Sequence, residues 1–113
     1  TANAFATAPG IAVAPGSVAG LLADTLPALT NRSGTVTTGG TAQQIMASNA
    51  SRTVGTVTNL HATSAWVSEV GTAASDTAGS VEVKQGGVYL VEGVGAVSWY
   101  HPTTGAKFTA TEG

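Results

Sequence analysis

Hydrophobic and polar residues alternate in short runs along most of the chain, and small turn-forming residues separate these runs. The clearest run is 81–84, where Val81 and Val83 share one face of an extended segment and Glu82 and Lys84 share the other. A period of two is typical of a half-buried β-strand. Similar runs rich in Val and Thr predict further strands over 34–38, 43–47, 54–60, 65–70, 88–91, 96–101 and 106–111.

Two of the turns between these runs have strong hairpin signals. Gly86 and Gly87 separate the runs 81–84 and 88–91, and the segment 102–105 begins with Pro and ends with Gly. No long helical pattern interrupts the strands, so we expect an all-β fold, an antiparallel β-sandwich or small barrel of about seven strands. The residues expected to supply most of its core are Val36, Val57, Trp66, Val81, Val83, Val88, Leu90, Val97 and Phe108.

The first 33 residues have a different character. They contain three of the four prolines and many apolar residues, which cannot build a core of their own between so many chain breakers. We therefore divide the chain into an extended N-terminal arm, 1–33, and a β-sandwich domain, 34–113. A disordered leader is the alternative for the arm. The apolar stretch 11–23 of the arm contains Pro15 and is too short to span a bilayer, so we expect no membrane partner.

The composition indicates a surface with few charges. Of the 113 residues, 9% are charged, and the formal net charge is −2, whereas about a quarter of the residues in an ordinary soluble domain are charged. Such a surface either consists of Ser, Thr, Ala and Gly in a monomer or is covered by other subunits in an assembly. Four Lys and Arg residues exclude a basic nucleic-acid binder, and the lack of Cys excludes disulfides and thiolate metal sites.

The residues that could carry chemistry are few. His61 and His101 are the two histidines, and their spacing does not bring them together, so we expect loop histidines and no metal site. Glu82 lies on the polar face of its strand and is expected to be solvated. Neither a nucleophile elbow nor a phosphate-binding glycine loop is present. We therefore expect no catalytic residues, no cofactor and no enzymatic activity.

Four aromatic residues remain as candidates for binding. Trp99 and Tyr100 are adjacent, so they point to opposite faces of a strand, and one of them is exposed or lies at an interface. Core and subunit packing is one interpretation of Trp66, Tyr89, Trp99 and Tyr100. A platform on which a sugar or a base stacks is the other.

Short motifs follow one another along the chain: Ser33-Gly-Thr-Val-Thr-Thr-Gly-Gly-Thr-Ala-Gln43, Ala50-Ser51-Arg52, Asn59, Ala65-Trp66-Val67, Gly71-Thr-Ala, Gln85-Gly-Gly87 and Thr103-Thr-Gly-Ala-Lys-Phe-Thr-Ala110. This series resembles small virion proteins of tailed bacteriophages. It covers about residues 33–111, and its members are mostly turn formers. The sequence departs from the pattern after Arg52, where a second Arg is common, and after Asn59.

The resemblance implies a structural role on the phage particle. The short chain and the apolar arm favour a capsid decoration or cement protein on the capsid surface of the virion, which binds the major capsid protein and forms a homotrimer. The alternative is a tail- or head-fibre module that binds host surface carbohydrate, with Trp66, or Trp99 and Tyr100, as its platform. The arm residues expected to contact the shell or a neighbouring subunit are Phe5, Ile11, Val13, Leu21 and Leu22.

Overall fold

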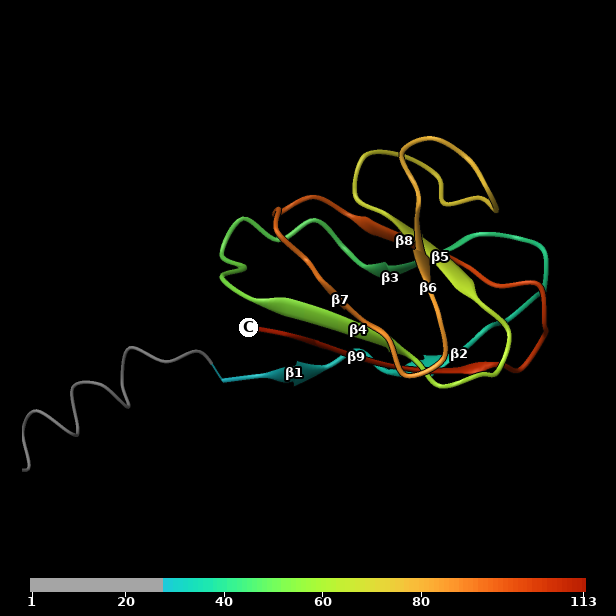
Figure 1. The fold of residues 1–113 in the computed structure, drawn as a ribbon. Coiled ribbons are helices and arrows are strands. Elements are labelled where there is room, and N and C mark those ends of the chain that lie inside the picture. The colour runs from blue at the N-terminus through green and yellow to red at the C-terminus, as the bar shows by residue number, and fades with distance from the viewer. Residues whose placement is uncertain (1–27) are drawn as a thin grey trace, which may run out of the picture.

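Two antiparallel β-sheets make up the fold in the computed structural model, which describes residues 28–113 (Figure 1). These residues form nine strands and no helix, which confirms the predicted all-β class. The five-stranded sheet A contains β1 (Thr30–Asn31), β2 (Gly34–Thr35), β4 (Gly55–Asn59), β7 (Val88–Leu90) and β9 (Lys107–Glu112). The four-stranded sheet B contains β3 (Gln43–Met46), β5 (Ala65–Ser68), β6 (Val81–Val83) and β8 (Val97–Tyr100).

Strand β9 is the centre of sheet A. Residues 108–112 of β9 pair with β4 on one side, from Gly55 opposite Glu112 to Asn59 opposite Phe108. On its other side it pairs with both β1 and β2. Phe108 and Ala110 are buried and the threonines between and after them face outward, as the alternation in this run predicts.

The core fills the space between the inward faces of the two sheets. Trp99 of sheet B is 1% exposed, and its ring lies 5.6 Å from that of Phe108 in sheet A. Asn59 ties the sheets together by a polar contact, because its buried amide donates a hydrogen bond of 2.9 Å to the carbonyl of Val83. The other buried apolar residues of this cluster are Val36, Met46, Val57, Ala65, Val67, Val83, Val91, Val97, Ala106 and Ala110.

The two predicted hairpins are wrong. β6 pairs with β5 in sheet B, whereas β7 pairs with β4 in sheet A, so the turn at Gly86 and Gly87 carries the chain from one sheet to the other. The turn at 102–105 does the same between β8 and β9. The glycines do form the tight turns that were expected, since Gly86 and Gly105 have φ values of 76° and 83°. Turn chemistry is local, but the choice of partner strand depends on packing between distant segments.

Three residues of the predicted core face outward instead. Tyr89 packs against the core, so its neighbours Val88 and Leu90 point to the outer face of sheet A and are 59% and 62% exposed. Trp66 is only half-buried, because Ala65 and Val67 on either side of it take the inward positions.

Val81 is a fourth correction to the predicted core. It pairs with the inward-facing Val67, but β6 is the edge of sheet B and leaves Val81 48% exposed. Four of the nine predicted core residues are thus wrong, and the other five, Val36, Val57, Val83, Val97 and Phe108, are buried as expected.

The sheet begins earlier in the chain than the predicted domain boundary at residue 34. Thr30 and Asn31 form β1 and pair with Glu112 and Thr111. The predicted contact residues of the arm lie outside the described residues: Phe5, Ile11, Val13, Leu21 and Leu22. Within residues 28–113, no helix is long and apolar enough to cross a membrane.

Candidate functional site

The outer face of sheet A presents a nearly uncharged surface of threonines and aliphatic side chains. Strand register places Leu90, Thr56 and Thr111 in one row across β7, β4 and β9. It places Val88, Thr58 and Thr109 in the next row. We call these six residues the threonine face.

Two of the hydroxyl groups on the threonine face share a hydrogen bond. The Thr56 and Thr111 hydroxyl oxygens lie 2.9 Å apart. Two charged residues of β9 flank these rows: Glu112, whose side chain is buried, and Lys107, which lies two residues before Thr109. The face therefore presents aliphatic groups and uncharged hydroxyls, and none of its six residues can form an ion pair with a ligand.

Two aromatic side chains lie next to each other on the outer face of sheet B. Trp66 on β5 pairs directly with Tyr100 on β8, and both are half-buried. The prediction that Trp99 contributes to an exposed aromatic interface is wrong, because its side chain lies in the core. Tyr100 is the outward member of that adjacent pair, and Trp66 is its neighbour. We call Trp66 and Tyr100 the aromatic pair.

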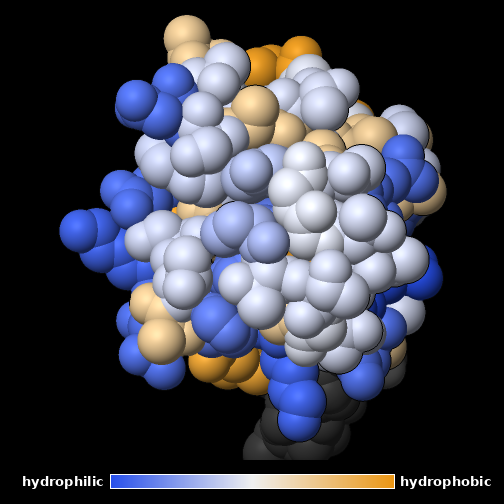
Figure 2. Space-filling view, turned by 90° about the vertical axis from the view of Figure 1, so that its right-hand side faces the viewer, coloured by the Kyte–Doolittle hydropathy of each residue, from blue (hydrophilic) through white to orange (hydrophobic). Residues whose placement is uncertain are grey.

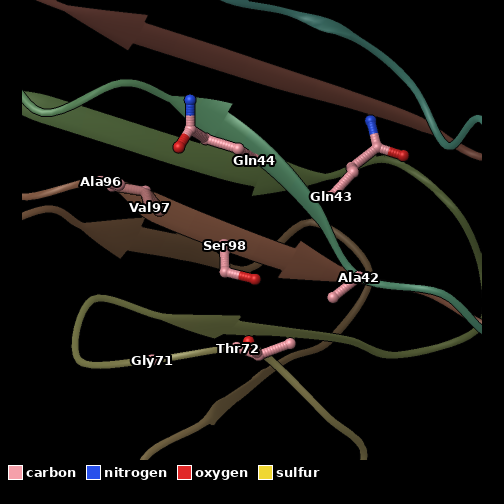
Figure 3. A pocket seen from close by; sticks show the side chains of 8 residues that line it. All are labelled: Ala42, Gln43, Gln44, Gly71, Thr72, Ala96, Val97 and Ser98. Atoms are coloured by element: carbon pink, nitrogen blue, oxygen red, sulfur yellow. The ribbon is translucent and has the colours of Figure 1, made fainter.

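A groove of about 290 Å³ is lined by residues of sheet B, among them Ser98, which lies two residues before Tyr100 on β8. Figure 3 shows the Ser98 side chain at its centre, between Ala42 and the loop that carries Gly71 and Thr72. The loop is held in place by a hydrogen bond of 2.9 Å from the Ala73 amide to the Ser98 hydroxyl. The full lining is Ala42, Gln43, Gln44, Gly71, Thr72, Ala96, Val97 and Ser98.

A buried ion pair anchors the end of sheet A. The Arg52 Nε donates to Glu112 Oε2 at 2.8 Å, and both side chains are less than 5% exposed. Arg52 also donates to the carbonyls of Ala47, Gly93 and Gly95. The hydrogen bond from Arg52, which outweighs the opposing effect of burial, holds the pKa of Glu112 below its usual range.

Two further groups bond to Glu112. The Arg32 Nε donates to its other carboxylate oxygen at 2.8 Å, but the Arg32 side chain is 45% exposed. The Asn49 amide adds a bond of 3.3 Å. The Arg52 guanidinium bonds to Glu112 and three backbone carbonyls, and the Glu112 carboxylate accepts from three side chains, so the cluster stabilises the fold.

Glu69 and Tyr89 form a second polar link. The Tyr89 hydroxyl donates to Glu69 at 2.5 Å, and the amides of Glu92 and Gly93 donate to the same carboxylate. Burial acts to raise the pKa of Glu69, but the hydrogen bonds outweigh it and the net effect is a lowered pKa. Burial and the adjacent carboxylate raise the pKa of Tyr89 to about 12. The link ties the turn at 92–95 to the end of β5.

The fold brings His61 and His101 together, contrary to the prediction from their spacing. Their rings lie edge to face with centroids 4.8 Å apart, and His101 is buried. The Thr63 carbonyl accepts from His101 Nε2, and the Thr103 amide donates to His101 Nδ1. Burial lowers the pKa of His101, and His61 adds to this effect. No group of three or more metal-ligating residues occurs within residues 28–113.

Sequence patterns missed the threonine face and the Arg52–Glu112 pair. The motifs at 56–58 and 109–111, each with Thr at both ends, do signal two strands with threonines on one face, but only the register shows that these strands are neighbours.

Figure 2 shows another part of the surface, where near-neutral residues cover the centre and the most hydrophilic residues lie around it.

Comparison with known proteins adds no relative to this picture. No family model, curated protein or solved structure matches the chain.

Proposed function

We propose that the chain is a structural protein of a bacteriophage virion, a capsid decoration or cement protein that binds and stabilises the shell of the major capsid protein. Its partners in this role are the shell and further copies of itself in a homotrimer. The proposal needs no catalytic group and no cofactor. It starts from the resemblance of residues 33–111 to small virion proteins, and a feature of the surface supports it.

That feature is the threonine face. Val88 and Leu90 expose most of their side chains at the open edge of sheet A, beside the threonines of β4 and β9. Clustered exposed aliphatic residues are typical of surfaces that contact another protein. An assembly with many copies tolerates a weak contact for each copy, which suits a small surface of this kind.

The position of β1 supports a role for the arm. β1 lies at the opposite edge of sheet A from β7, so residues 1–27 join the domain on the sheet that carries the threonine face. An apolar segment that orders when it docks can contact several subunits. We therefore propose that Phe5, Ile11, Val13, Leu21 and Leu22 contact the shell or a neighbouring copy.

Co-sedimentation with capsid shells that lack this protein tests the proposal. The full chain should sediment with the shells, and its mass in solution should be that of a trimer. The double variant Val88→Asp, Leu90→Asp should lose most of its shell binding, because it places two charges in a contact that excludes water. Deletion of residues 1–27 should also abolish binding, with the unfolding midpoint of the remaining domain unchanged.

Val70→Asp is the matched control for the threonine face. Val70 is 82% exposed in the loop after β5, which belongs to the other sheet. This variant should bind shells like the unmodified chain. A monomer that does not sediment with shells, or a threonine-face variant that binds as well as Val70→Asp, contradicts the proposal.

A further inference from the structure

The aromatic pair is fixed on the outer face of sheet B by the strand register. Trp66 lies opposite Tyr100 on β8 and opposite Glu82 on β6. Its neighbours Val67 and Trp99 take the inward positions, so neither ring of the pair can turn into the core without displacing a buried side chain. The sheet therefore holds two aromatic side chains next to each other at the surface, with Cβ atoms about 5 Å apart as in any directly opposed pair.

Polar groups continue the surface on one side of the pair. Ser98 lies two residues from Tyr100 on the same face of β8, a distance of about 7 Å along a strand, and it lines the groove together with Thr72 and Gln44. The Ser98 hydroxyl accepts from the Ala73 amide and keeps its own proton for donation. Ala42, the small residue before β3, lines the end of the groove nearest Tyr100.

The charges near the pair do not favour an anion. Glu82 lies opposite Trp66 on β6, and Lys84, which follows this strand, has the opposite charge. The groove lining contains no charged residue. Nucleic acids and phosphorylated ligands need several cationic groups beside the stacking rings. A neutral ligand with an apolar face and many hydroxyl groups fits this surface.

From this combination we propose that the outer face of sheet B binds neutral oligosaccharides. One pyranose ring packs its C–H face on the aromatic pair, and the hydroxyls of an adjacent sugar unit bond to Ser98 and Thr72 in the groove. The inference goes beyond the proposed decoration role and does not depend on it, because it concerns the sheet opposite the threonine face. A protein with both surfaces could attach to a shell through one sheet and to a glycan through the other.

An NMR titration of the full chain tests this site. Cellohexaose, chitohexaose and maltohexaose are each added to ¹⁵N-labelled protein, and the two indole N–H signals are followed. The Trp66 signal and the amide signals of Ser98 and Tyr100 should shift and saturate with at least one sugar, with a Kd on the order of 1 mM. The Trp99 signal should stay in place, since that indole is in the core, and it reports that each variant is folded.

Substitutions then locate the binding. Trp66→Ala and Tyr100→Ala should each raise Kd by about tenfold, a typical effect of losing one aromatic contact, whereas Tyr100→Phe keeps the ring and should bind normally. Gly71→Leu should also weaken binding, because a Cβ at Gly71 meets nothing within 4 Å and the longer side chain extends over the groove. Thr109→Leu adds a similar side chain to sheet A and should have no effect.

Three results would overturn the proposal. The first is the absence of a saturable shift with all three sugars. The second is sugar binding that Trp66→Ala leaves unchanged. The third is a set of shifts on this face that follows protein concentration without sugar, which would mean that a second copy of the chain covers it. Loss of shell binding in the threonine-face variant does not bear on any of these outcomes.

Discussion

At the scale of single residues, Arg52 forms more hydrogen bonds than any other charged side chain within residues 28–113. Its guanidinium is buried and bonds to the Glu112 carboxylate and to three backbone carbonyls. Removing one partner of a buried ion pair leaves a charge without compensation and costs about 3–5 kcal/mol. An exposed ion pair contributes about 0–1 kcal/mol.

The two arginines that bond to Glu112 provide a matched comparison. Arg52→Ala should lower the free energy of unfolding by about 3–5 kcal/mol, and Arg32→Ala, at a partly exposed site, by about 1 kcal/mol or less. Urea denaturation monitored by the fluorescence of the buried Trp99 measures both. Equal losses from the two variants would contradict a dominant role for the buried pair.

The same cluster predicts how stability depends on pH. The folded state lowers the pKa of Glu112, so the stabilisation from this group is complete above the ordinary Glu pKa and is lost as the pH falls through the lowered value. The lowered pKa of Glu69 acts in the same direction. The urea midpoint should therefore fall steeply below about pH 4.3. In Glu112→Gln the decrease of the urea midpoint in this acidic range should be smaller.

His101 should produce an earlier and separate loss of stability. Its pKa is lowered in the folded state, so the unfolded chain takes up a proton first as the pH falls through the ordinary His value of about 6.5. The urea midpoint should decrease between about pH 7 and pH 5 in the unmodified chain and in Glu112→Gln alike. In His101→Asn this early decrease should disappear. A curve with the same early decrease in His101→Asn would show that another group is responsible.

At the scale of elements, strand positions could be predicted from the sequence, but strand partners could not. β4, β8 and β9 lie within a residue or two of the predicted runs, because Val/Thr alternation and glycine turns are local signals. The run 88–91 shows the limit. Val88 and Leu90 were predicted to face inward, but Tyr89 takes that face, and only packing against the opposite sheet decides between the two alternating sets.

The candidate surfaces could be predicted from the sequence only to the same extent, because they too depend on which strands are neighbours. Trp66 and Tyr100 were both recognised as candidates, but nothing in the sequence says that β5 and β8 are neighbours. The pairing of Arg52 with Glu112 joins residues 60 positions apart. Such contacts depend on the completed topology, whereas the residue types that make them are visible beforehand.

A glycine turn connects the ends of the two sheets and gives a prediction for this scale. A Cβ at Gly39 would lie 2.3 Å from the Pro102 carbonyl oxygen and 2.7 Å from the Thr104 nitrogen, both backbone atoms that cannot move aside. Gly39→Ala should therefore destabilise the domain by about 1–3 kcal/mol, the usual cost of overpacking. Gly71→Ala, at a site with open space, should leave the unfolding midpoint nearly unchanged. Thermal denaturation of the two variants makes the comparison.

At the scale of the whole molecule, the low charge predicts how the proposed association responds to salt. The threonine face has no charged residue, so contact through it depends on apolar burial and not on ion pairs. Raising NaCl from about 0.1 M to about 1 M shortens the screening length from about 10 Å to about 3 Å. Shell binding should persist across this range in co-sedimentation. Loss of binding at high salt would indicate a charged contact elsewhere.

The central position of β9 also determines when the fold can form during synthesis. β1 and β2 have no partner in sheet A except β9, and β4 has only the three-residue β7 until residues 107–112 have left the ribosome. The first strands to emerge must therefore wait for a segment made more than 70 residues later, since Thr30 pairs with Glu112. Contacts of such long sequence separation form slowly. The nascent chain consequently exposes the unpaired edges of β1 and β2 until β9 becomes available for pairing.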